Sequence, residues 1–127
     1  MKLLSSGISP VITNATLAGY EESVSNISVS GNVNLDISKF NVFNVRLTAN
    51  ANITFINPPA VDKMAPVTVI LRQNATGNLS ATFNNVLYTD GNDPQLSTGA
   101  NQIDVLSFFT VDGGATYLGT FAMANVS

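Results

Sequence analysis

Chemistry in this 127-residue chain depends on eight carboxylates, five basic side chains and many amides and hydroxyls, because the sequence contains neither His nor Cys. A His-based catalytic triad, a thiol nucleophile and the usual zinc and iron ligand sets all need one of these two residue types. The residues that could still do chemistry are Asp and Glu, acting as acids, bases or ligands of hard cations.

The densest group of oxygen ligands is Asp90, Asn92 and Asp93, around Gly91. Calcium takes roughly six to eight oxygen ligands, and these side chains could supply several. No Glu follows at the spacing of a helix-loop-helix calcium loop, however, and Asx residues beside Gly are typical of tight turns. We interpret the segment as a turn and predict no metal and no cofactor. With Tyr88, the same side chains form a candidate recognition surface, since Tyr, Asn and Asp suit sugar ligands.

Glycoside hydrolysis would need two carboxyl groups a few ångströms apart. Asp104 and Asp112 flank one predicted strand, and eight positions along a strand separate them by roughly 26 Å. They cannot act as a pair on that strand, although Asp36 or Asp62 could pair with either. We therefore predict no catalytic residues and a protein that is not an enzyme. A depolymerase with an acidic cleft shared between subunits is a further alternative.

Neutral polar side chains replace charge in this chain. Charged residues make up 10% of it, against roughly 25% in an average soluble domain. Asn, Ser and Thr number 16, 12 and 12, and alternating Asn and Thr suit the solvent-facing side of strands. The net charge of -3, with only five Lys and Arg, argues against nucleic acid and acidic membranes as partners.

The first seven residues, MKLLSSG, are too short for a signal-peptide core of roughly 7–15 apolar residues. No run approaches the roughly 18 apolar residues of a membrane span. The absence of Cys agrees with a reducing compartment. We expect synthesis and assembly in a cytoplasm.

Period-two alternation predicts most of the regular structure. The residues that share one strand face are Val33, Leu35 and Ile37, then Phe43, Val45 and Leu47, then Ala51, Ile53 and Phe55. Pro58 and Pro59 end the third strand because they remove ladder donors. A continuous apolar run at 67–71 predicts a strand covered on both faces, with its return strand at 79–83.

The clearest hairpin follows a loop at 84–102 that is rich in Gly, Pro, Asn and Asp. Its strands are predicted at 103–111 and 116–123, joined by a turn in which Gly supplies positive φ. Within the first strand, Phe108 and Phe109 point to opposite faces. One ring is therefore predicted in the core and the other under a loop or against a partner subunit.

About eight short strands with turns between them predict an all-β fold, an antiparallel β-sandwich or jelly-roll-like single domain. We place the sandwich at 31–127. Residues 1–30 form an irregular N-terminal arm or the first strands of the same domain, and 17–24 could hold one helical turn.

The C-terminal half carries four motifs in a specific order. They are FINPP at 55–59, VTVILRQNATGN at 67–78, PQLSTGANQ at 94–102 and IDVLSFFTVDGGATY at 103–117. In this order and spacing they resemble a module of tailed-bacteriophage structural proteins, seen in tail fibres, receptor-binding tips and small capsid decoration proteins. That class often has Trp after the Thr-Gly turn and after the Asp-Gly-Gly turn, whereas this chain has Phe83 and Tyr117 near those points.

The resemblance implies a β-rich virion protein, commonly a trimer. A tail fibre needs an anchor and a long shaft, and only about 50 residues precede the module. We therefore expect a capsid decoration, or cement, protein, a homotrimer on the outer capsid surface that binds the major capsid protein and stabilises the lattice. The alternative is a receptor-binding module of a tail fibre or spike that recognises host polysaccharide through loops such as 88–98.

The N-terminal stretch has more apolar side chains than a free tail should carry. We predict that it docks on a partner subunit or on the capsid, while a first sandwich strand containing Ile8, Val11 and Ile12 is equally compatible with the sequence. The candidate partner-binding residues are Leu3, Leu4, Ile8, Val11, Ile12 and Leu17.

Overall fold

Seven strands and one short 3-10 turn form the regular structure of residues 11–127, the part of the chain described by this computed structural model. The elements are β1 (Val24–Asp36), β2 (Val42–Ile56), β3 (Ala65–Arg72), β4 (Ala81–Phe83), β5 (Val86–Leu87), η1 (Thr89–Gly91), β6 (Ile103–Thr110) and β7 (Tyr117–Met123). The predicted all-β fold is confirmed. The helical turn suggested for 17–24 is wrong, because residues 17–23 have no regular structure and β1 begins at Val24.

All seven strands belong to one mixed sheet with the order β1-β2-β3-β6-β7-β5, and β4 also pairs with β2. Four strand pairs are parallel: β1–β2, β2–β3, β2–β4 and β5–β7. Only β3–β6 and β6–β7 are antiparallel. The predicted hairpin at the C-terminus is thus confirmed, and the expectation of a wholly antiparallel sheet is wrong.

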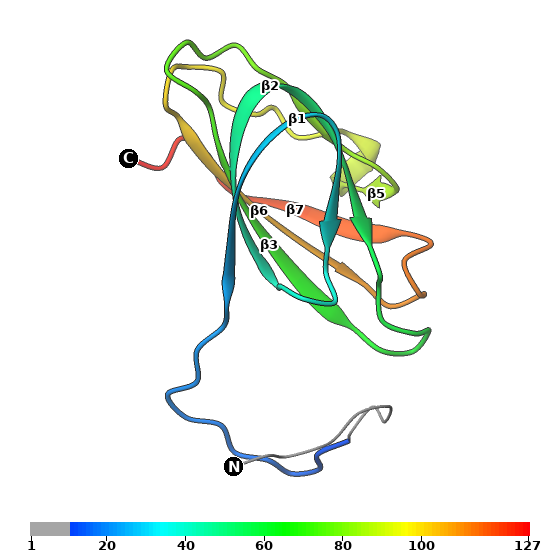
Figure 1. The fold of residues 1–127 in the computed structure, drawn as a ribbon. Coiled ribbons are helices and arrows are strands. Elements are labelled where there is room, and N and C mark those ends of the chain that lie inside the picture. The colour runs from blue at the N-terminus through cyan, green and yellow to red at the C-terminus, as the bar shows by residue number, and fades with distance from the viewer. Residues whose placement is uncertain (1–10) are drawn as a thin grey trace.

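The parallel pairing of β1 with β2 requires both strands to curl. Val24 pairs with Val42 and Asp36 with Ile56, although only residues 37–41 connect the strands. A straight strand of 13 residues would be about 43 Å long, whereas the connection can span at most about 20 Å. The end of β1 therefore returns close to its start, and Figure 1 shows β1 and β2 arching over together. Parallel strands normally need a separate crossover of about a dozen residues; here the second half of β1 is that crossover.

The curl divides β2 between two neighbours. Residues 42–46 pair with β3, and residues 51–53 pair with β4. In β1 the bend falls at Gly31, where the register shifts and φ is 65°. Glycine tolerates this left-handed backbone because it has no Cβ. We call β1, β2, β3 and β4 together the parallel coil.

One apolar core fills the inside of the curled sheet. The inward faces predicted from alternation are confirmed, with Val33 only partly buried on the edge strand β1. Four aromatic rings meet at the centre. The Phe55 ring centroid lies 5.1 Å from those of Phe108 and Tyr117, and that of Phe83 lies 4.8 Å from Phe108. Tyr117 is therefore a core residue, and the partly buried Phe83 packs against the core.

Candidate functional site

The N-terminal residues predicted to bind a partner project away from the sheet. Figure 1 shows residues 11–23, here called the exposed arm, leaving the start of β1 and running away from the other strands. Within the described part of the chain, the exposed arm makes no hydrogen bond to the sheet. Its large apolar side chains are 82%, 63%, 71% and 68% exposed at Val11, Ile12, Leu17 and Tyr20. Val11 and Ile12 do not lie in a strand, and Leu3, Leu4 and Ile8 lie outside the described residues.

The predicted recognition loop brings only part of its residues together. Asp90, Asn92 and Asp93 are exposed around η1, and Asp90 has a φ of 55°. Tyr88 is half-buried, and a Cβ added at Gly119 would lie 2.7 Å from its ring. Burial, with a smaller contribution from the charge of Asp93, raises the pKa of Tyr88 to about 12. The tyrosine therefore stays neutral and packs partly inward, leaving an amide and carboxylates as the exposed groups of this loop.

A shallow hollow of about 180 Å³ lies between this loop and β7. Its lining includes Tyr88, Thr89, Asn92 and Phe121. The combination of one aromatic edge with a hydroxyl and an amide can accept a polar ligand. Among residues 11–127 no group of three His, Cys, Asp or Glu side chains is placed to hold a metal ion.

The two carboxylates considered for catalysis have structural partners. Asp104 is buried and accepts hydrogen bonds from the Ser97 N–H at 2.7 Å, the Ser97 hydroxyl at 2.7 Å and the Asn125 N–H at 3.0 Å. Asp112 accepts hydrogen bonds from the Thr116 hydroxyl at 2.6 Å and N–H at 3.0 Å, and from the Thr110 hydroxyl. These bonds, those from Thr116 first, lower the pKa of Asp112 to about 2. Both acids hold loop backbone in place.

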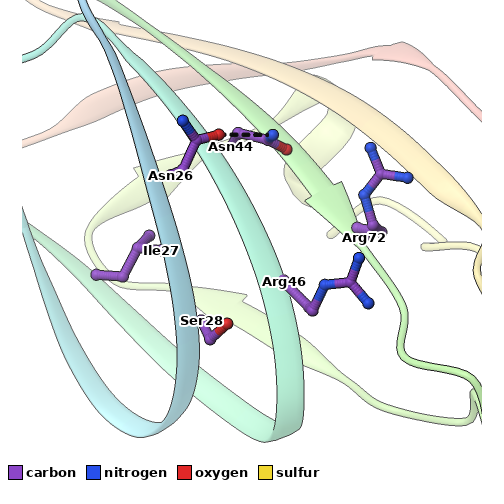
Figure 2. A pocket seen from close by; sticks show the side chains of 6 residues that line it. All are labelled: Asn26, Ile27, Ser28, Asn44, Arg46 and Arg72. Carbon is purple, nitrogen blue, oxygen red and sulfur yellow. Dashed lines mark hydrogen bonds between the residues drawn. The ribbon is translucent and has the colours of Figure 1, made fainter.

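The curl creates a further site that the sequence did not reveal. On the outer face of the sheet, a hollow of about 310 Å³ is lined by Asn26, Ile27, Ser28, Asn44, Arg46 and Arg72. We call it the arginine hollow (Figure 2). Arg46 and Arg72 are register partners on β2 and β3, so their guanidinium groups share one face. Beside them the Asn44 side-chain amide donates to Asn26 Oδ1 at 2.9 Å.

Two positive charges side by side on a sheet face repel each other. In residues 11–127 no carboxylate lies within 4.0 Å of either guanidinium to offset this repulsion. Each guanidinium keeps a planar fork of donors suited to a carboxylate or another oxyanion. The arginine hollow is therefore arranged to accept an anionic group from outside this chain's own sheet.

Sequence reasoning missed the arginine hollow because Arg46 and Arg72 are 26 positions apart. The alternation at 43–47 did indicate that Arg46 faces outward. Arg72 lies beside Arg46 because β2 and β3 pair in parallel in this register. An antiparallel pairing would have given Arg46 a different neighbour. The available clue was that the chain has only two Arg, each directly after an inward-facing apolar residue.

A smaller apolar surface lies on the outer face of the hairpin. Phe108 is fully buried, whereas Phe109 is 36% exposed, so the prediction of one ring on each face is confirmed. Phe109 pairs with Leu118, which is also exposed. This pair is a second place where a partner could bind.

Comparisons of the chain with protein-family models, curated proteins and solved structures found no match. No helix within residues 11–127 is long and apolar enough to span a membrane.

Proposed function

We propose that this chain is a non-enzymatic structural protein of a tailed-bacteriophage virion, namely a capsid decoration protein. In this proposal it forms a homotrimer on the outer capsid surface, binds the major capsid protein and stabilises the capsid lattice, after assembly in the host cytoplasm. The motif order from Phe55 to Tyr117 supports the class. The observation that supports the decoration role is the exposure of large apolar side chains on the exposed arm.

Large apolar side chains on an extended segment are unfavourable in water. Burying one Val, Leu or Ile fully is worth roughly 1.5–3 kcal/mol, and Val11, Ile12 and Leu17 all lack cover from the sheet. A partner surface that covers the exposed arm would gain this free energy, less the cost of ordering both partners. A protein that binds only the assembled shell stabilises it by its binding free energy, and many copies add their contributions.

The finer architecture that we propose for the curled sheet is the sandwich or jelly roll expected from the sequence. This proposal is supported by the core, because Leu47 and Ile53, from the two halves of the curled strand β2, belong to the same buried cluster. Low charge also suits assembly, because charged residues are depleted at the centres of protein interfaces.

Stoichiometry in the purified particle tests the proposal. Quantitative mass spectrometry against the major capsid protein should find copies in the hundreds, whereas a few dozen or fewer would place the chain at a tail or vertex and contradict decoration.

Particle stability tests the role of the exposed arm. We expect particles that lack this protein to melt at a higher temperature when the chain is added back. A V11S/I12S/L17S variant should lose this effect. The matched control is V61S/M64S/L87S, which changes apolar residues that are similarly exposed on the body. Equal loss in both variants would contradict a specific role for the exposed arm.

The second candidate function is a receptor-binding module of a tail fibre or spike. The hollow beside Tyr88 favours it, because Tyr88, Thr89 and Asn92 offer the aromatic and polar contacts that a host polysaccharide would use. A low copy number together with specific binding on a glycan array would establish this function over decoration.

A further inference from the structure

Among the charged residues of this chain, two pairs of like charge are separated in space. The only two Glu, Glu21 and Glu22, are consecutive on the exposed arm, and the only two Arg lie side by side in the arginine hollow. Both Glu are exposed, and no ion pair joins them to a basic side chain within residues 11–127. An acidic pair and a basic pair thus stand without partners in one molecule.

The two pairs do not meet within the molecule as it is folded. Ser28 is the register partner of Arg46 on β1, and Glu22 precedes Ser28 by six positions, or about 20 Å of extended chain. The exposed arm continues away from the sheet at the start of β1 (Figure 1). The acidic pair therefore lies off the sheet, before the start of β1, and not over the arginine hollow of its own chain.

The arginine hollow lies beside an open sheet edge. β1 is the first strand in the sheet order, so among residues 11–127 no strand pairs with one side of its backbone. Such an edge can bind an extended segment by adding it as a new strand. Asn26 and Ser28 of β1 separate this edge from Arg46. An added strand would lie about 10 Å from β2, two strand spacings, which a Glu and an Arg side chain can bridge together.

The exposed arm has the pattern of a strand that fits this sheet. Residues 14–17, NATL, repeat the polar and apolar alternation of 32–35, NVNL, in β1 and of 52–55, NITF, in β2. Those two segments pair in register, with Asn32 opposite Asn52. Residues 14–17 can therefore extend the same ladder, with Ala15 and Leu17 on one face and Asn14 and Thr16 on the other.

We propose that the exposed arm of a second copy of this chain binds along the open edge of β1 and places Glu22 against Arg46. Successive side chains of a strand point to opposite faces, so Glu22 shares the polar face of Asn14 and Thr16. Arg72, one strand beyond Arg46, adds positive charge on that same face. The inference rests on the self-association included in the proposed function and names the contact that produces it.

Because the exposed arm and the arginine hollow are different surfaces, each copy gives its arm to one neighbour and receives the arm of another. Such head-to-tail contacts form a ring when the rotation between copies closes, as the proposed homotrimer requires. Arginine–carboxylate hydrogen bonds are charge-assisted and directional, so they also set the position of the added strand.

Charge exchange in the isolated full-length chain tests this contact. Self-association is measured by sedimentation equilibrium, and folding by circular dichroism. We expect R46E/R72E and E21R/E22R each to weaken self-association at least tenfold, and the variant that combines all four substitutions to restore it. The matched control is K39E/K63E, which makes the same change in net charge at exposed Lys residues of the body and should leave association unchanged.

Several results would overturn the inference. They are unchanged association of R46E/R72E, failure of the charge exchange to restore association, and a wild-type chain that stays monomeric. Loss of particle binding by R46E/R72E without loss of self-association would also overturn it, since the arginine hollow would then bind the capsid. A chain that associates through these residues but is absent from capsids would contradict only the decoration function.

Discussion

The parallel coil and the C-terminal hairpin pack on the same core but are held by different interactions at the surface. In the parallel coil, amides and hydroxyls on neighbouring strands bond to each other: Asn52 Nδ2 donates to Asn32 Oδ1 at 3.3 Å, and Thr82 Oγ1 donates to Asn52 Oδ1 at 2.9 Å. These residues are 20 and 30 positions apart. In the hairpin, Asp112 bonds to residues two and four positions away.

The difference separates local from non-local stabilisation. The hairpin turn can form from its own residues, because its carboxylate reaches both Thr side chains within one short segment. The rows of Asn and Thr in the parallel coil align only after β1 and β2 have curled. We therefore expect changes in the shared core to affect both regions, and changes at the surface to affect one of them.

The largest expected effect comes from removing the ring that joins the two regions. Phe108 of β6 contacts Phe55 of the parallel coil, and its replacement by Ala should cost roughly 3–5 kcal/mol. Urea denaturation should show one transition by both circular dichroism and tyrosine fluorescence. The neighbouring Phe109→Ala, on the outer face, is the control and should cost much less. Two separate transitions would mean that the regions fold independently.

Two glycines with positive φ give a sharper comparison. A Cβ at Gly114, in the hairpin turn, would lie 2.5 Å from Pro58 Cγ, whereas nothing lies within 4 Å of one at Gly31. Gly31→Ala should cost only the left-handed backbone strain, roughly 1–2 kcal/mol. Gly114→Ala adds a clash and should cost roughly 1–3 kcal/mol more. Equal midpoints of urea denaturation for the two variants would show that the turn moves to relieve the clash.

The pH dependence of stability should come partly from the hairpin. The pKa of Asp112 is lowered from 3.8 to about 2 by hydrogen bonds from Thr116. A lowered folded-state pKa means that the ionised carboxylate stabilises the fold. This contribution is complete above the unfolded pKa and is lost as the pH falls from about 4 to about 2. Asp112→Asn should therefore lose less stability than the wild type over that range, as measured by urea denaturation.

Hydrogen exchange can locate this effect. At pH 2 the amides of residues 110–117 should lose more protection than those of β1 and β2. A uniform loss across both regions would contradict a local role for Asp112.

The smallest effect is expected in the amide rows of the parallel coil. Asn52→Ala removes two surface hydrogen bonds and should cost about 0.5–1 kcal/mol. Asn92→Ala, at an exposed loop position, is the control and should change the urea midpoint less. If Asn52→Ala lowers the free energy of unfolding as much as Phe108→Ala does, the amide rows stabilise the fold far more than surface hydrogen bonds usually do.

The sequence by itself determined where most strands lie, which side chains face the core, and the position of the hairpin with its Asp-Gly-Gly turn. These features depend on alternation and turn residues within a few positions. The outward direction of Arg46 and the separate faces of Phe108 and Phe109 belong to the same group. The unusual content of Asn and Thr also indicated which faces would meet water.

Only the tertiary structure decided the direction of strand pairing, the partners of the buried Asp104, and the arginine hollow. A short connection between strands normally predicts an antiparallel pair. The curl of β1 overturned that expectation, because a strand that returns to its own start can be followed by a parallel neighbour. Arg46 and Arg72 became neighbours through the resulting register. Residues this far apart in the chain meet only when the whole core closes, and no local pattern encodes that event.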